Sequence, residues 1–165
     1  MRYVGRYATS RAKLVGYLSR KVRERGWDGS GEPDLGGIAS RFAELGYVDD
    51  AAYALAKSQA LSSRGYGKRR INERLRLAGI GEEEGAAARH HADAHAIDSA
   101  LRFAERRRIG PFAQSEIDLK QREKAIASML RAGHSFALAK AIVSWPRDSE
   151  IDRQALAERA RLVDA

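Results

Sequence analysis

Few residues in this sequence have the types and the spacing that metal binding or catalysis requires. His91 and His95 lie four residues apart, a spacing that places two metal-binding imidazoles on one helix face, and Asp98 lies near that face. The sequence has no cysteine and no His-Glu-x-x-His motif, so solvent-exposed histidines are expected rather than a metal site. We therefore predict no metal site, no catalytic residue and no cofactor.

Two acidic runs could be mistaken for catalytic carboxylates. Asp49–Asp50 and Glu82–Glu84 both precede or open expected helices, where the positive end of the helix dipole accounts for them. The sequence also lacks a P-loop, a Gly-x-Ser-x-Gly motif and a dinucleotide-binding fingerprint. An enzyme is therefore the least supported class of protein.

The strongest candidate for a functional surface is the basic segment RGYGKRRINERLR, residues 64–76. Three of its cations open an expected helix, where the macrodipole disfavours positive charge, so they suggest a use such as binding phosphate or an acidic partner. The structural alternative is a solvated basic face moderated by Glu73. The candidate contact residues are Arg64, Lys68, Arg69, Arg70 and Arg76.

Helical geometry directs two of these side chains away from the core. If Ile71 faces the core, Arg69 and Arg76, seven residues apart, share the opposite face. Tyr66 precedes this helix and could stack on a nucleobase. Its place directly after Gly65 favours instead a hydrophobic contact that closes the preceding helix.

The whole chain is basic, with 30 Lys and Arg against 22 Asp and Glu and a net charge of +8. Such a domain attracts polyanions, although an arginine-rich surface without such a partner is an equal alternative. The run Glu105–Arg108 ends an expected helix, whose negative end accounts for its cations, with contact to a partner as the less favoured alternative. No apolar run approaches the roughly 18 residues of a membrane span, and no apolar signal region is evident, so a cytoplasmic protein is expected.

Apolar residues recur with helical spacing along the chain, and no stretch has the period of a strand, so an all-α fold is predicted. Capping boxes are expected at Ser115 with Asp118 and at Ser149 with Asp152, and Ser135 is expected to cap another helix. A short helix of undefined ends is expected within residues 81–92. The other expected helices cover residues 9–25, 34–45, 49–63, 68–78, 93–107, 115–132, 135–143 and 149–163.

The stretch LGYVDD shows how these helices are joined. Gly46 ends one helix in a left-handed conformation, Tyr47 folds back onto the last turn, and Asp49 caps the next helix. This recurring joint suggests tandem three-helix units. The same pattern occurs at Gly26–Trp27, Gly65–Tyr66, Gly79–Ile80 and Gly133–His134.

Three of these stretches, in this order, resemble the RecX family of regulators of the RecA recombinase. They are LGYVDDAAYA, RGYGKRRINERLRLAGI and LRAGHSFALAKAIV, and the resemblance covers residues 10–143. Its most specific part is residues 45–80. His134 stands where the family usually has an aromatic residue, and Ala51 and Ala52 stand where charged residues are common.

The resemblance implies three tandem three-helix repeats in an extended, curved, solenoid-like array. On this basis we expect an N-terminal tail at residues 1–8 and repeats at residues 9–63, 64–109 and 110–165. It also implies a non-enzymatic, monomeric protein of DNA repair and recombination, including the SOS response. Such proteins lie in the groove of the RecA–DNA filament and dampen its ATPase, strand-exchange and co-protease activities, with DNA contacted weakly or through the filament.

Two other classes of function remain open from the residues alone. One is a stand-alone DNA-binding protein that uses residues 68–78 as a recognition helix. The other is a helical scaffold with no role at nucleic acid.

Overall fold

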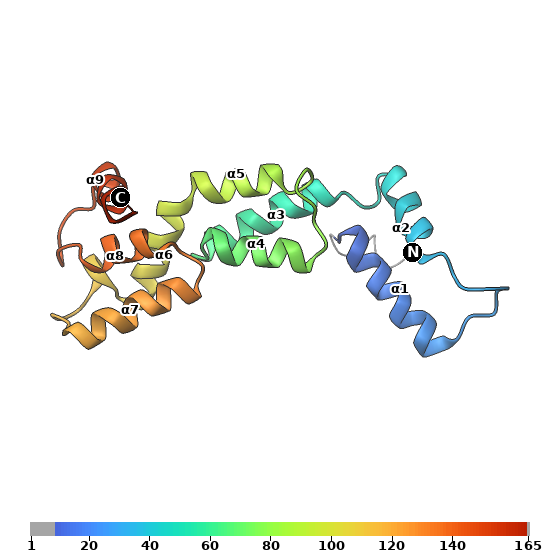
Figure 1. Cartoon of the computed structure of the whole chain (residues 1–165), viewed down its shortest axis with the longest axis horizontal. Helices are drawn as coiled ribbons and strands as arrows, with labels where there is room; N and C mark the ends of the chain where they lie inside the picture. The colour runs from blue at the N-terminus through green and yellow to red at the C-terminus, as the bar shows by residue number, and fades with distance from the viewer. Residues whose placement is uncertain (1–8, 165) are drawn as a thin grey trace. The chain divides into compact units, whose positions relative to one another are not determined.

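The computed structural model describes residues 9–164, which contain nine α-helices, one short 3₁₀-helix and no strand (Figure 1). The prediction of an all-α fold is confirmed, and the helices pack in the manner of a helical repeat array. The helices are α1 Arg11–Arg25, α2 Leu35–Glu44, α3 Asp50–Ser63, α4 Lys68–Leu77, α5 Ala86–Ala94, α6 Ala96–Arg107, η1 Gly110–Phe112, α7 Leu119–Arg131, α8 Phe136–Val143 and α9 Arg153–Asp164.

The described chain divides into two compact units. Unit 1 comprises residues 9–56 and 74–88, and unit 2 comprises residues 57–73 and 89–164, so α3, α4 and α5 contribute to both. This division differs from the expected three repeats, which stay a prediction. Their expected bounds were residues 9–63, 64–109 and 110–165. The expected tail at residues 1–8 lies outside the described residues.

In unit 1, α1 and α2 pack together around a small core, and polar contacts fix the start of α1. The Ser10 hydroxyl donates to the Ala78 carbonyl over 2.6 Å. The Arg11 guanidinium donates to Asp50 at 2.9 Å and to Glu84 at 2.8 Å, which ties α1 to the start of α3 and to the loop before α5. The buried residues of the core between α1 and α2 are Leu14, Ala39 and Val48.

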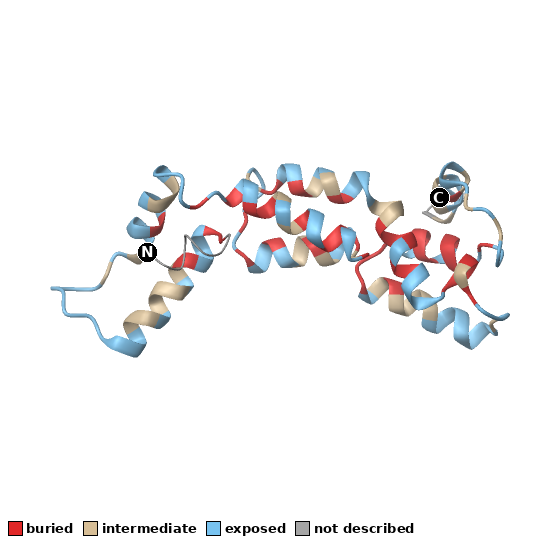
Figure 2. Cartoon of the chain, turned by 180° about the vertical axis from the view of Figure 1, so that it is seen from behind, coloured by how far each residue is buried: buried red, intermediate tan, exposed pale blue. Residues whose placement is uncertain are grey.

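In unit 2, α8 is the central element. Six of its eight residues are buried, and it packs against α6, α7 and α9. Buried positions are red in Figure 2, which shows how densely they occur in this part of the chain. Trp145, just after α8, is buried, and the Arg159 guanidinium lies 4.5 Å from the centre of its ring, which attaches α9.

Four of the five predicted joints have the Schellman arrangement, in which two amides after the helix bond back to its last turn. At Gly46, whose φ is 74°, the Gly46 amide donates to Ala43 and the Tyr47 amide to Phe42, both over 2.9 Å. The Tyr47 ring lies 5.7 Å from the Phe42 ring, although Tyr47 is 56% exposed. The same pair of bonds forms at Gly65, Gly79 and Gly133, with φ values of 75°, 70° and 97°.

The prediction for Gly26 is wrong, because the chain there takes only part of this arrangement. Gly26 has a φ of 79° and its amide bonds to Val22, but no second bond follows. Trp27 does not fold back onto α1; its indole N–H donates to the Gly31 carbonyl over 3.0 Å, so the ring covers its own loop.

One joint of this kind was not predicted. Arg108 has a φ of 55°, its amide donates to Glu105, and the Ile109 amide donates to Ala104 over 2.9 Å. Ile109 is buried and supplies the hydrophobic contact. Because an arginine occupies the left-handed position, the sequence carries no glycine signal there.

Both predicted serine-led capping boxes are wrong in register. Asp118 is itself the N-cap of α7 and forms a capping box with Gln121, so α7 begins after Ser115 by a full turn. Asp152 accepts from two amides at the start of α9, whereas the Ser149 hydroxyl donates back to the Pro146 carbonyl. A carboxylate is favoured at the positive end of a helix, which explains why the acid is the cap. The caps expected at Asp49 and Ser135 are confirmed.

The surroundings of two joint glycines predict different costs of substitution. A methyl at Gly46 has no neighbour within 4 Å, so Gly46→Ala should lower the free energy of unfolding only through the strain of alanine in the left-handed conformation, about 1–2 kcal/mol. A methyl at Gly79 lies 2.3 Å from the Ala12 Cβ, so Gly79→Ala should lose about 1–3 kcal/mol more through overpacking. Urea unfolding followed by circular dichroism measures both.

A double mutant checks that the added cost comes from the contact with Ala12. Ala12→Gly removes the opposing methyl, so the loss in Ala12→Gly/Gly79→Ala should be smaller than the sum of the single losses. Additive losses would show that the contact with Ala12 is not the source of the added cost. Equal losses for Gly46→Ala and Gly79→Ala would show that there is no added cost at Gly79.

Candidate polyanion-binding surface

The five candidate contact residues of the basic segment lie at the end of α3 and on α4. Arg64 is exposed at the end of α3, and Lys68, Arg69 and Arg76 are exposed on α4, whereas Arg70 is half-buried. On the same helix Ile71 and Leu75 are 1% and 0% exposed, so the predicted phase of α4 is confirmed. Arg76 belongs to unit 1 and the other four cations to unit 2.

Two of these five cations are paired with carboxylates. Lys68 Nζ lies 2.7 Å from Asp93, and Arg70 lies 2.7 Å from Glu73. Arg64, Arg69 and Arg76 form no ion pair within residues 9–164. Among the five candidate residues, these three guanidinium groups are therefore the ones without a carboxylate partner in the described chain.

The start of α4 is capped by carbonyl groups at the end of α7. The Gly67 amide donates to the Ala132 carbonyl over 2.9 Å, and the Arg69 amide donates to the Gly133 carbonyl over 3.1 Å. The negative end of α7 thus meets the positive end of α4. The cations in the first turn of α4 therefore do not require an external anion, as the sequence suggested, because the negative end of α7 already compensates them.

The same joint holds a buried histidine. His134 is 2% exposed, its Nε2 lies 3.1 Å from the Gly65 carbonyl oxygen, and its ring packs against Phe103. Burial lowers the pKa of His134, and the hydrogen bond to Gly65 opposes this only in part. The neutral imidazole therefore acts as a structural donor at this joint.

A basic hollow, which sequence reasoning missed, lies beside this joint in unit 2. Arg106 and Arg107 come from the end of α6 and Arg131 from the end of α7, and all three are exposed. The sequence signals were the run Glu105–Arg108, whose cations the helix end alone accounted for, and Tyr66. The residues that line the basic hollow are Tyr66, Phe103, Arg106, Arg107, Ser128, Arg131 and Ala132.

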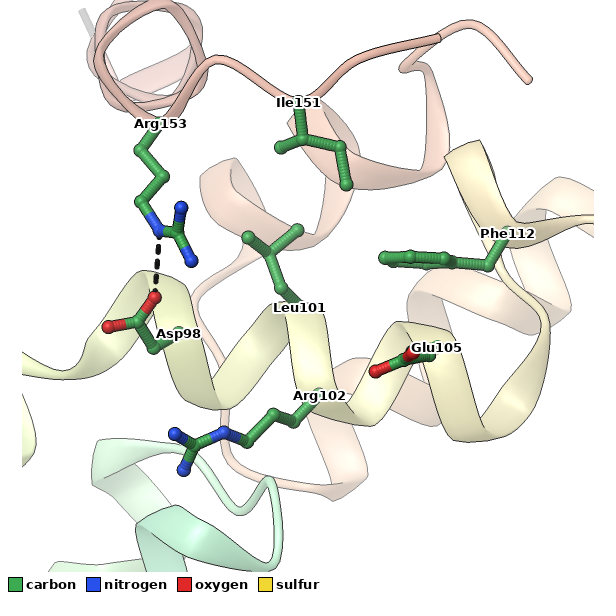
Figure 3. Close-up of a pocket in the computed structure, with 7 residues that line it drawn as sticks. All are labelled: Asp98, Leu101, Arg102, Glu105, Phe112, Ile151 and Arg153. Carbon is green, nitrogen blue, oxygen red and sulfur yellow. Dashed lines mark hydrogen bonds and ion pairs between the residues drawn. The ribbon is translucent and has the colours of Figure 1, made fainter. Parts of the chain in front are cut away.

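A second hollow in unit 2, of about 240 Å³, has paired charges instead (Figure 3). Arg153 at the start of α9 donates to Asp98 of α6 over 2.9 Å, beside the apolar side chains of Leu101, Ile151 and Phe112. Because this hollow carries both signs of charge, with Arg102 and Glu105 on its wall, it suits the attachment of α9 better than it suits a polyanion.

The histidine pair does not form a metal cluster. The rings of His91 and His95 stack with their centres 4.1 Å apart, and no group of three or more His, Asp or Glu residues within residues 9–164 is arranged to hold a metal ion. His95 is exposed, as predicted, but the prediction is wrong for His91, which is half-buried and lies 3.5 Å from the Ser58 hydroxyl. Burial, together with the nearby His95, lowers the pKa of His91.

Within the described residues, none of the helices has the length and apolar character that crossing a membrane requires.

Comparison with known proteins gives consistent matches along most of the chain. The regulatory protein RecX of Myxococcus xanthus (strain DK1622) is 31% identical over 153 residues, which cover 87% of this chain and 81% of that protein. The regulatory protein RecX of Mycobacterium sp. (strain JLS) is 31% identical over 159 residues, with 92% and 84% covered. The one from Agrobacterium fabrum (strain C58) is 28% identical over 138 residues, with 82% and 74% covered. No protein-family model matches the chain.

The buried histidine predicts a pH-dependent stability of unit 2. Because folding lowers the pKa of His134, the unfolded state binds the proton first, so stability is full above the unfolded pKa of about 6.5 and is lost as the pH falls below it. The slope contributed by one proton is at most about 1.4 kcal/mol per pH unit. Urea unfolding between pH 7.5 and 5 measures it, with Trp145 as the fluorescent reporter in a Trp27→Phe background.

The matched control is His134→Gln, which keeps an N–H donor for Gly65 but does not titrate. The difference between the two proteins isolates His134 from His91, whose lowered pKa acts in the same direction. Parallel stability curves for the two proteins would rule out this role of His134.

Proposed function

This chain belongs to the RecX family of regulatory proteins, and we propose that it binds RecA–single-strand DNA filaments and dampens their ATPase, strand-exchange and co-protease activities. The observation that carries the proposal is the identity of 31% with a regulatory protein RecX along most of both chains. We propose a non-enzymatic, cytoplasmic monomer built from three-helix repeats, acting in DNA repair, recombination and the SOS response.

The exposed arginines without an ion pair support contact with a polyanionic filament. Arg64, Arg69 and Arg76 present guanidinium groups that no carboxylate of the described chain neutralises. A guanidinium binds phosphate and carboxylate oxygens through paired hydrogen bonds, and such contacts release counterions from nucleic acid. In this proposal Lys68 and Arg70 contribute less to filament binding, because they form ion pairs with Asp93 and Glu73.

The geometry of α4 favours the filament regulator over a stand-alone DNA-binding protein. A recognition helix reads base edges with residues near its N-terminal end. Here the amides of Gly67 and Arg69 at that end are bonded to carbonyls of the α7–α8 joint, whose backbone lies directly against them. Entry of this end of α4 into a groove therefore conflicts with its packing, whereas contact through exposed side chains does not.

The first prediction from this proposal concerns RecA activity. Equimolar protein should slow DNA-dependent ATP hydrolysis by RecA, also when it is added to filaments that have already formed, and should hydrolyse no ATP itself. A protein that only coats DNA would slow the reaction when added before RecA, but not afterwards. Unchanged ATP turnover on preformed filaments, with folded protein, would refute the proposal.

The second prediction concerns Arg69 and Arg76. Because both side chains are exposed, Arg69→Ala/Arg76→Ala should change the free energy of unfolding by no more than about 0.5 kcal/mol per site. If each contacts a phosphate of the filament, the salt dependence should weaken. The negative slope of log affinity against log salt should become shallower by about 1.4 to 1.8. Co-sedimentation with filaments assembled on a non-hydrolysable nucleotide, at several salt concentrations, measures this slope.

The control removes the same charge elsewhere. Arg122 and Arg161 are exposed on α7 and α9, outside the basic segment, so Arg122→Ala/Arg161→Ala should keep the slope of the unmodified protein. Equal loss of binding in both double mutants would show that only net charge matters, and no loss in either would favour the scaffold alternative.

A further inference from the structure

The basic hollow of unit 2 differs from the rest of that unit in how its cations are compensated. Elsewhere in unit 2 ion pairs form between Lys68 and Asp93, Arg70 and Glu73, Arg147 and Asp148, and Arg153 and Asp98. The basic hollow brings together three guanidinium groups, and no carboxylate is among the described residues that line it. Each cation suits the helix end that carries it, but helix ends do not explain why three meet in one concave place.

Backbone packing and side-chain contacts restrict two of these groups, Arg106 and Arg107. The Gly65 joint lies so close to α6 that an added Cβ would be 2.9 Å from the Phe103 amide nitrogen. Arg106 donates a hydrogen bond to the Arg64 carbonyl, and the Arg107 guanidinium lies 5.9 Å from the centre of the Phe103 ring. Both side chains are thus partly ordered before any ligand arrives, which reduces the entropy lost on binding.

An aromatic ring stands beside these cations. Tyr66 is half-buried and lines the basic hollow, and its amide donates to the Leu61 carbonyl over 3.0 Å, which holds the backbone at the joint. Phe103 is 6% exposed, so Tyr66 is the ring that a ligand reaches. A held aromatic ring next to guanidinium groups is the combination that binds a planar base together with a phosphate.

We propose that the basic hollow binds a nucleoside phosphate, with the phosphate held by Arg106 and Arg131 and the base stacked on Tyr66. Its volume of about 530 Å³ lies within the range of small-molecule sites, about 300–1,000 Å³. The ligand is either a free nucleotide or the phosphorylated end of a single strand, since both present the same chemistry. The inference does not rest on the proposed regulation of RecA, and no recombinase is needed to test it.

Fluorescence anisotropy in 0.15 M salt tests the proposal with two probes. One is ATP labelled on its ribose, and the other is a labelled oligo-dT with a 5′-phosphate, compared with the same strand ending in a 5′-hydroxyl. Binding of labelled ATP identifies the free nucleotide as a ligand, whereas binding confined to the phosphorylated strand identifies the strand end. Either result supports the proposal, and binding of neither probe overturns it.

Substitutions then place the ligand in the basic hollow. Arg106→Ala/Arg131→Ala should weaken binding by about tenfold or more, because each removes a charge-assisted hydrogen bond. Tyr66→Leu keeps an apolar side chain at the joint but removes the stacking surface, so binding should weaken by about fivefold or more. Should Arg106→Ala lower the melting temperature, Arg131→Ala alone is the decisive variant, because Arg131 forms no ion pair within the described residues.

The charge-matched control is again Arg122→Ala/Arg161→Ala, which should change binding by less than about twofold at this ionic strength. Equal weakening in the control and in Arg106→Ala/Arg131→Ala overturns the proposal, since binding then follows net charge. Unchanged affinity in Tyr66→Leu overturns the stacking of the base. Displacement of the labelled probe by polyglutamate but not by unlabelled ATP or by the unlabelled 5′-phosphorylated strand also overturns the proposal, because the surface would then be one for acidic peptide.

Discussion

The crossing of the backbone at Gly67 and Gly133 is the contact on which the basic face of unit 2 depends. A Cβ at Gly67 would lie 2.4 Å from the Gly133 carbonyl group, and one at Gly133 would lie 2.4 Å from the Arg70 amide nitrogen. Only glycine at both positions lets the end of α7 come close enough for its carbonyls to accept from the start of α4. This approach joins α4 to α7, which carries Arg131 at its end.

The crossing also explains how so many cations share one region. The C-terminal ends of α3, α6 and α7 meet here, and each contributes the negative end of a helix dipole, which favours nearby cations. Arg106 satisfies the Arg64 carbonyl with one N–H group. Because a guanidinium has five donors in a fixed plane, it can compensate a helix end and still offer donors to a ligand. A structural role and a binding role are therefore compatible in the same side chain.

The fold was predictable where its signals are local. A Schellman joint involves six consecutive residues, so a glycine followed by an apolar or aromatic residue was sufficient to find the joints at Gly46, Gly65, Gly79 and Gly133. The prediction was wrong at Gly26, where the ring of the next residue found a partner further along the loop. It missed the joint at Arg108, because the buried Ile109 makes the hydrophobic contact without a glycine before it.

The candidate site was less predictable, because the availability of a cation depends on what the rest of the chain brings to it. Helical phase was enough to find that Arg69 is exposed. It could not show that Lys68 forms an ion pair with Asp93, which lies 25 residues further along the chain, or that carbonyl groups at the end of α7 cap the start of α4. Composition likewise gives the same weight to each arginine, although Arg131 stands in a hollow with no carboxylate among its described lining residues. Net charge therefore attracts an anion to the whole protein, whereas tertiary packing decides which few guanidinium groups are free to hold it.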